Sequence, residues 1–298
     1  MRDLRRWLPW LSGVVLTGAL VWLQDWRALL AALAHADIAS FSAWLMLFVL
    51  LWWLVESANL HSLFHRAGLP QPWVEIAMLR GHSYLWQIVN YALAVGSIGL
   101  FLRRRAGIGT ARAAGVMAVY MWAELIALAL LALPGWQSTG LFARSVAGTA
   151  AAFVLLSLLL AAALRRNVRG LQRMPLLAAL RLFRWRDLAA VIAGRCIYFG
   201  AFIVFFYCTL PAFGIAVPLP VLLAAVPAIF LVGNLPVSAA GVGTIQAGML
   251  FCFRDYAPAQ AILAFGLCYS AGLIFGRLPL ALLCSLHASP AKRSVFSD

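Results

Sequence analysis

Most of this chain consists of long apolar stretches that are separated by short polar or basic ones. Six of these stretches are long and uniform enough to cross a bilayer as single helices, at 7–23, 38–60, 115–133, 141–164, 188–210 and 259–286. A spanning segment is predicted to be helical because hydrocarbon offers no hydrogen-bond partners to an open backbone. The pattern therefore predicts an all-α polytopic membrane protein, in which residues 1–298 form a single integral membrane domain.

A further apolar stretch, 219–253, is broken in its middle. The break contains Asn234, Pro236, Gly241, Gly243 and Gln246. Proline removes a backbone donor and glycine adds backbone freedom, so this segment cannot be an ordinary helix. Within a membrane, such backbone is tolerated only where protein or a wet cavity satisfies the freed groups. We expect either a re-entrant hairpin that lines a binding cavity or a kinked helix that only packs against its neighbours.

The stretch 73–102 is interrupted in a similar way, by Arg80, Asn90, Gly96 and Gly99. Basic or histidine residues lie on both sides of it, at 61–66 and at 103–105. Because positive residues favour the cytoplasmic side, both ends of the stretch are predicted to be cytoplasmic. The chain must then enter and leave the membrane on the same side, as a re-entrant hairpin that turns near Asn90. The alternative is a bundle of eight helices without hairpins.

Counting the crossings gives the same order of elements in each half of the chain. Residues 1–135 and residues 136–298 each read as span, span, hairpin and span. The first half starts in the cytoplasm and the second half starts outside, which places both chain termini in the cytoplasm. The predicted fold is therefore about six full spans plus two re-entrant helical hairpins, arranged as an inverted repeat of the kind found in secondary transporters.

Composition and charge agree with a membrane location. Hydrophobic residues make up 64% of the chain and charged residues 11%, with a formal net charge of +14. The basic residues form short runs that border apolar spans, so they indicate orientation in a membrane rather than binding to nucleic acid. The run at 165–186 is predicted to be either a surface helix on anionic headgroups or a solvated loop.

Five ionisable residues fall inside the apolar stretches: Glu56, Arg80, Glu124, Arg195 and Arg277. Such residues are costly in a membrane and usually face the protein interior. One interpretation is that the three arginines bind a phosphate headgroup through paired hydrogen bonds, while a glutamate balances their charge. The other is that all five form structural ion pairs.

Candidate chemistry of other kinds is weak. His61 and His65 share one helix face, but no third metal ligand is evident near them, and the five cysteines show no Cys-x-x-Cys spacing. No nucleophile with a convincing base is evident within the apolar stretches. We therefore expect no metal, no cofactor and no catalytic residues.

Short motifs resemble those of the flippase-like family typified by the transmembrane region of lysylphosphatidylglycerol synthase. The similarity lies in Asn90 to Gly99 followed by the arginines at 103–105 and then Ala106-Gly-Ile-Gly-Thr110, and in Leu235-Pro236 with Gly241-Val-Gly243. Gly96-Ser97 and Gln246 stand where the family has acids, and Glu124 is the one acid near its Glu-Arg-x-x-Asp motif. The resemblance implies lipid translocation, whereas the missing acids argue against its ion coupling and the missing transferase domain argues against lysyl transfer.

We expect a lipid transporter of the bacterial cytoplasmic membrane that moves an amphipathic, anionic lipid or lipid-linked precursor. The predicted substrate-binding residues are Asn90, Gly96, Gly99, Asn234, Pro236, Gly241, Gly243, Gln246, Arg80, Arg195 and Arg277, with Glu56 and Glu124 as intramembrane acids. The alternatives are a membrane-embedded lipid-modifying enzyme and a scaffold for envelope assembly. Expected partners are membrane lipids, and either a second copy of the chain or envelope-biosynthesis enzymes. Phospholipid, polyprenyl-linked sugar and hopanoid substrates all remain open.

Overall fold

The computed structural model describes residues 18, 26–89, 91–137, 140–165, 179–233 and 243–286. Within these ranges the chain is all-helical, with ten α-helices and three short 3-10 helices. The α-helices are α2 (Trp26–His35), α3 (Ile38–Arg66), α4 (Trp73–Val89), α5 (Tyr91–Ala106), α6 (Thr110–Ala132), α7 (Leu141–Arg165), α9 (Trp185–Thr209), α10 (Leu219–Gly233), α11 (Thr244–Phe253) and α12 (Ala259–Leu286). The 3-10 helices are η1 (Leu133–Gln137), η3 (Ala179–Leu182) and η4 (Leu210–Phe213).

Five of these helices are long and apolar enough to cross a membrane, which makes the chain a multi-pass membrane protein. They are α3, α6 with η1, α7, α9 with η4, and α12, and they match five of the six predicted spans. The other predicted span, 7–23, lies outside the described residues.

Two predicted spans begin earlier than their apolar residues indicate. The α6 helix begins at Thr110, directly after the turn in which Gly107 has φ +62°. The α9 helix begins at Trp185, because the Asp187 carboxylate accepts a hydrogen bond from the backbone N–H of Arg184 at 2.9 Å. Such a cap satisfies a helix donor that would otherwise lack a partner, so a polar first turn is added to an apolar helix.

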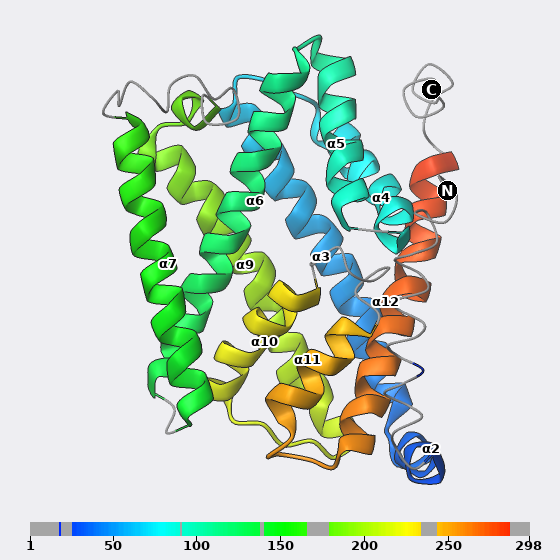
Figure 1. The fold of residues 1–298 in the computed structure, drawn as a ribbon. Coiled ribbons are helices and arrows are strands. Elements are labelled where there is room, and N and C mark those ends of the chain that lie inside the picture. The colour runs from blue at the N-terminus through cyan, green and yellow to red at the C-terminus, as the bar shows by residue number, and fades with distance from the viewer. Residues whose placement is uncertain are drawn as a thin grey trace, which may run out of the picture.

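Two pairs of shorter helices complete the bundle. The helices α4 and α5 pack on each other, as do α10 and α11. Figure 1 shows the α4/α5 pair in the upper half of the bundle and the α10/α11 pair in the lower half. The α4 helix ends at Val89 and α5 begins at Tyr91 and packs on it, whereas the predicted turn residue Asn90 lies outside the described residues and re-entry into the membrane stays a prediction.

The packing partners in the first half of the chain have counterparts in the second half. The central contact joins α3 to α9. Around it, α4 packs on α12 while α10 packs on α6, and α3 packs on α4 while α9 packs on α10. Likewise α5 packs on α6 while α11 packs on α12. Each contact of the first short pair is therefore matched by a contact of the second.

Close approach of α4 to α12 depends on a small residue. A Cβ atom added to Gly81 would lie 2.9 Å from the Cβ of Cys284, which is closer than real side chains come. Small residues at such crossings let helix backbones approach in a membrane, where packing rather than the hydrophobic effect holds helices together. Gly81 therefore helps to bring Arg80, its neighbour in the chain, to the interface with α12.

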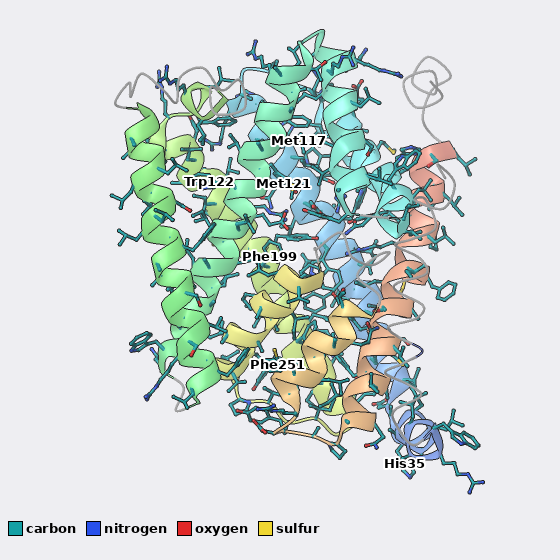
Figure 2. The ribbon with its side chains drawn as sticks, in the orientation of Figure 1. His35, Met117, Met121, Trp122, Phe199 and Phe251 are labelled. Atoms are coloured by element: carbon teal, nitrogen blue, oxygen red, sulfur yellow. The ribbon has the colours of Figure 1, made fainter. Side chains whose placement is uncertain are left out.

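The two halves of the interior differ in composition. An aromatic core joins α3 to α9 and α12, and in it Trp52 stacks on Phe202 with ring centroids 3.9 Å apart. A second apolar core lies between α3, α5 and α6 and includes Met117 and Val116. Figure 2 shows Met117 and Met121 on the upper part of α6, and Phe251 near the lower end of the bundle. The charged cluster described below lies among helices that contribute residues to one or both of these cores.

The upper end of the bundle in Figure 1 carries a group of arginines. It contains the C-terminal ends of α3 and α5 and the N-terminal ends of α6 and α9. These ends carry Arg66, Arg103, Arg104, Arg105, Arg112, Arg184 and Arg186. The segment from Arg181 to Arg186 is not one surface helix, since η3 ends at Leu182, Phe183 is buried and α9 starts at Trp185.

Candidate functional site: a buried ionic cluster

The five ionisable residues of the apolar stretches come together inside the bundle. Each lies on a different helix: Glu56 on α3, Arg80 on α4, Glu124 on α6, Arg195 on α9 and Arg277 on α12. None is more than 8% exposed to solvent. Burying charges is costly unless they are paired and hydrogen-bonded, so their contacts decide what this cluster can do.

Glu56 lies at the centre of the cluster. One of its oxygens, Oε2, forms an ion pair with Nη2 of Arg80 at 2.6 Å. The other, Oε1, accepts a hydrogen bond from the hydroxyl of Tyr120 at 2.9 Å and lies 3.4 Å from Nη1 of Arg195. One carboxylate thus connects α3 to α4, α6 and α9.

Arg195 links the two carboxylates. Its Nη2 donates to Oε2 of Glu124 at 2.6 Å, and its Nη1 donates to the hydroxyl of Tyr120 at 2.7 Å. The same oxygen of Glu124 accepts a hydrogen bond of 2.5 Å from the hydroxyl of Tyr91, the first residue of α5. The guanidinium also lies 4.4 Å from the ring centre of Tyr198, close enough for a cation–π interaction.

Arg80 is held by residues of its own helix as well as by Glu56. Its Nη1 donates to the hydroxyl of Ser83 at 2.7 Å, and its Nη2 donates to Oε1 of Gln87 at 3.1 Å. Its guanidinium lies 4.5 Å from the ring centre of Tyr84. The spacing of these residues along α4 places them on one helix face, so a single face of the first short pair presents all of these groups to the cluster.

Arg277 differs from the other two arginines. Its guanidinium lies 4.9 Å from the ring centre of Tyr84, the same ring that Arg80 contacts. It forms no hydrogen bond or ion pair within the described part of the chain, and its Nε is buried without a partner. The cluster therefore contains three arginines and two described carboxylates. The carboxylates pair with Arg80 and Arg195, so the excess positive charge lies at Arg277. A buried cation with free donors is suited to binding an anion.

The second short pair contains a polar site of a different kind. Gly243 has φ +89°, a conformation that favours glycine, and its backbone N–H donates to Oε1 of Gln246 at 2.7 Å. The Nε2 of Gln246 donates to the carbonyl of Gly266 at 3.1 Å and to the hydroxyl of Ser270 at 2.9 Å. Gln246 thus satisfies the backbone amide of Gly243, and its contact with a substrate stays a prediction.

The remaining predicted binding residues divide into two groups. Asn90, Asn234, Pro236 and Gly241 lie outside the described residues. Gly96 and Gly99 are both on α5 and are not part of the ionic cluster. A Cβ on Gly99 would lie 3.3 Å from Cγ of Met117, whereas a Cβ on Gly96 would meet nothing within 4 Å, so Gly99 serves the packing of α5 on α6.

The tyrosines of the cluster were not among the predicted site residues. Tyr91, Tyr120 and Tyr198 contact the charged groups directly, and the ring of Tyr84 contacts both Arg80 and Arg277. A signal was present in the sequence, because Tyr84 follows Arg80 by four positions and Glu124 follows Tyr120 by four. Residues at that spacing share a helix face, so a buried charge predicts that a tyrosine one turn away faces the same interior.

The described residues include no group of three histidine, cysteine, aspartate or glutamate side chains that could hold a metal ion. No protein-family model and no curated protein matches this chain. The chemistry of the ionic cluster and the arrangement of the helices are therefore the basis on which a function can be proposed.

Proposed function

We propose that the protein is a lipid transporter that moves an anionic, amphipathic lipid across the membrane through the region of the ionic cluster. The observation that carries the proposal is Arg277, a buried guanidinium that lies against the same tyrosine ring as Arg80 and has no anionic partner in the described part of the chain. A phosphate-bearing headgroup would supply the missing negative charge. Arginine suits this role because its planar fork can donate two parallel hydrogen bonds to phosphate oxygens.

The arrangement of the short pairs supports a transport path. If the bundle spans a membrane along its long axis, α4/α5 and α10/α11 enter from opposite sides and end at mid-depth (Figure 1). They would then be re-entrant hairpins. The matched contacts of the two halves support an inverted repeat, a construction common in transporters that bind substrate near the bilayer midplane.

The described charges support an orientation. The end of the bundle with the C-termini of α3 and α5 carries Arg66 and the arginines at 103–105, so the positive-inside rule places it in the cytoplasm. The N- and C-termini of the chain would then also be cytoplasmic. The resemblance of the sequence motifs to flippase-like proteins agrees with this function, and a bacterial cytoplasmic membrane is the location that it implies.

The contacts of the cluster suggest how a headgroup would be handled. A phosphate that reached Arg277 would also lie near Arg80 and would compete with Glu56 for its guanidinium, because both groups lie against the ring of Tyr84. Release of that ion pair would loosen α4 from α3, while Arg195 could remain held by Glu124. The acyl chains would stay in the surrounding lipid throughout.

The test is leaflet-resolved transport in proteoliposomes, with fluorescent phosphatidylglycerol and a polyprenyl phosphate as separate probes. Arg277→Gln should lower the rate at least tenfold, since a charge-assisted hydrogen bond in a dry site contributes about 1.5–3 kcal/mol. Arg103→Gln removes the same charge from an exposed position on α5 and should leave the rate nearly unchanged.

Arg277→Gln is expected to fold, because it removes no ion pair of the described residues, and monodispersity in detergent checks this. Equal transport by Arg277→Gln and wild type would reject the cluster as the path. Chemical conversion of either probe by the purified protein would instead support a lipid-modifying enzyme.

A further inference from the structure

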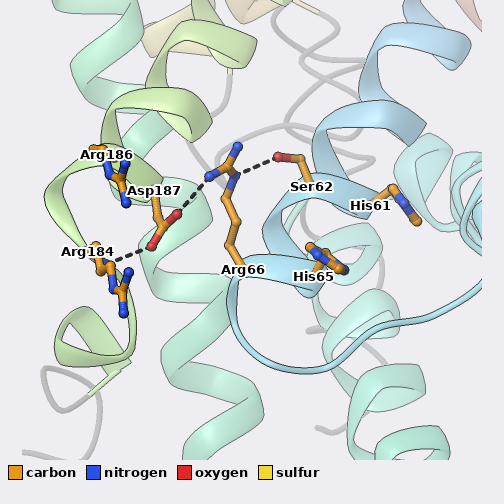
Figure 3. A pocket seen from close by; sticks show the side chains of 7 residues that line it. All are labelled: His61, Ser62, His65, Arg66, Arg184, Arg186 and Asp187. Carbon is orange, nitrogen blue, oxygen red and sulfur yellow. Dashed lines mark hydrogen bonds and ion pairs between the residues drawn. The ribbon is translucent and has the colours of Figure 1, made fainter.

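A second concentration of charge lies at the end of the bundle, away from the ionic cluster. Here α3 ends and α9 begins, and a cavity of about 870 Å³ lies between them. It is lined by His61, Ser62, His65, Arg66, Arg184, Arg186 and Asp187 (Figure 3). Every lining residue is polar or charged.

The charges in this cavity do not balance. Arg66 is paired, since its Nη1 lies 2.7 Å from Oδ1 of Asp187 and its Nε donates to the hydroxyl of Ser62 at 3.0 Å. Asp187 is the one carboxylate among the seven lining residues, and it also accepts from the backbone of Arg184. The guanidinium groups of Arg184 and Arg186 form no hydrogen bond or ion pair within the described ranges.

Two imidazoles also line the cavity. The ring nitrogen Nδ1 of His61 is buried and has no hydrogen-bond partner. The rings of His61 and His65 lie nearly parallel, with centroids 6.5 Å apart and an interplanar angle of 20°. The N-terminal end of α9 adds the positive end of a helix dipole. Arginines, imidazoles and a helix N-terminus around one polar cavity are together suited to an anion with several oxygens.

We propose that this cavity is a binding site for a phosphate or diphosphate group. Arg184 and Arg186 would bind its oxygens, Arg66 would be positioned beside it by Asp187 and Ser62, and His61 would donate a further hydrogen bond. Two exposed apolar side chains, Leu182 and Trp185, flank this end of α9. Tryptophan is common at the level of lipid headgroups, so the rim is suited to a phosphate that is attached to a lipid as well as to a free one.

The cavity is separate from the ionic cluster, although the same two helices carry both. Along α3, Glu56 precedes His61 and His65, and along α9, Arg195 follows Asp187, in each case by at least one helical turn. Phosphate would therefore bind here whether or not the protein transports lipid, and this site can fail while transport persists.

Binding can be measured with the full chain in phosphatidylcholine nanodiscs, titrated with inorganic pyrophosphate by calorimetry. The variant Arg184→Gln with Arg186→Gln should weaken the affinity about tenfold, because exposed charge contacts change binding by up to about fivefold each. The control is Arg103→Gln with Arg104→Gln, which removes the same charge from exposed positions of α5 and should retain the wild-type affinity.

A change of opposite sign makes the test sharper. Asp187→Asn removes the one negative charge of the lining, so pyrophosphate affinity should rise several-fold. The amide oxygen of the new side chain can still accept from the Arg184 amide. The matched control Glu75→Gln, which removes the partner of Arg105 on α4, should leave it unchanged. Equal pyrophosphate affinity of the wild type, the double arginine variant and Asp187→Asn would reject the proposed phosphate site.

Two further experiments distinguish a lipid headgroup from a soluble phosphate compound as the ligand. Nanodiscs that contain phosphatidic acid should weaken apparent pyrophosphate affinity if a lipid headgroup reaches the cavity, and the effect should be lost in Arg184→Gln with Arg186→Gln. Pyrophosphate binding that is insensitive to phosphatidic acid would support the same site with a soluble phosphate compound. Absence of pyrophosphate binding to the wild-type protein, together with no effect of phosphatidic acid on its thermal stability, would reject both.

Discussion

The two short helix pairs occupy matched places in the bundle but are joined to it by different chemistry. The α4/α5 pair brings Arg80 and Tyr91 to a network of buried charges that also includes Glu56, Glu124 and Arg195. The α10/α11 pair lies on apolar and aromatic surfaces, and its polar anchor in the described residues is the neutral Gln246. Similar packing is therefore stabilised in two ways, by buried ion pairs around α4/α5 and by apolar contacts with one neutral hydrogen-bonded side chain around α10/α11.

The two ways should respond differently to mutation. Removal of one charge from a buried network leaves its partners uncompensated, which costs more than loss of a neutral hydrogen bond. The aromatic packing around α10/α11 should tolerate change better, because neighbouring side chains can shift.

Arg195→Leu should lower the free energy of unfolding by about 3–5 kcal/mol, because Glu56 and Glu124 lose a common partner in a buried site. Unfolding in mixed micelles, followed by tryptophan fluorescence, gives the measurement. Addition of Glu56→Gln and Glu124→Gln to the same chain should restore much of the loss, since the uncompensated charges are then removed. A loss below about 1 kcal/mol for Arg195→Leu alone would show that the cluster is hydrated and its charges weakly coupled.

Gln246→Leu should cost about 1–3 kcal/mol, since it leaves the Gly243 amide without its acceptor and removes the bonds to Gly266 and Ser270. The same unfolding measurement applies. Met249→Leu, a change of similar volume at a fully buried position of the same helix, is the control and should cost less than about 1.5 kcal/mol. If Gln246→Leu costs as much as Arg195→Leu, the proposed contrast between the two pairs is wrong.

Arg105→Gln should have the smallest effect, below about 1 kcal/mol, although it also breaks an ion pair of the first short pair. The side chain of Arg105 is 51% exposed and that of Glu75 is 15% exposed, so water screens the pair from the arginine side. The loss should shrink further at high salt, because salt screens exposed charges. A cost as large as that of Gln246→Leu would mean that charge, and not burial, sets the difference.

Much of the architecture follows from the pattern of apolar residues. Stretches such as 38–60 and 141–164 have no other stable arrangement in hydrocarbon than a helix, so length and hydropathy are enough to predict them. The chain reversal within 73–102 was predicted from charge at its two ends. The polar first turn of α9 was not predicted, because it depends on the hydrogen bond from the backbone N–H of Arg184 to the carboxylate of Asp187. Hydropathy does not report such a local contact.

The sequence alone shows that five ionisable residues lie in apolar stretches and must find partners inside the protein, since lipid cannot solvate them. The identity of those partners depends on how the helices pack. Glu56 and Arg195 are far apart in the chain, and their meeting depends on how α3 crosses α9. Packing of α4 on α12 places Arg277 beside Tyr84, without a carboxylate partner among the described residues. Which charge stays unpaired is a property of helix packing, because side chains from five helices compete for two described acids.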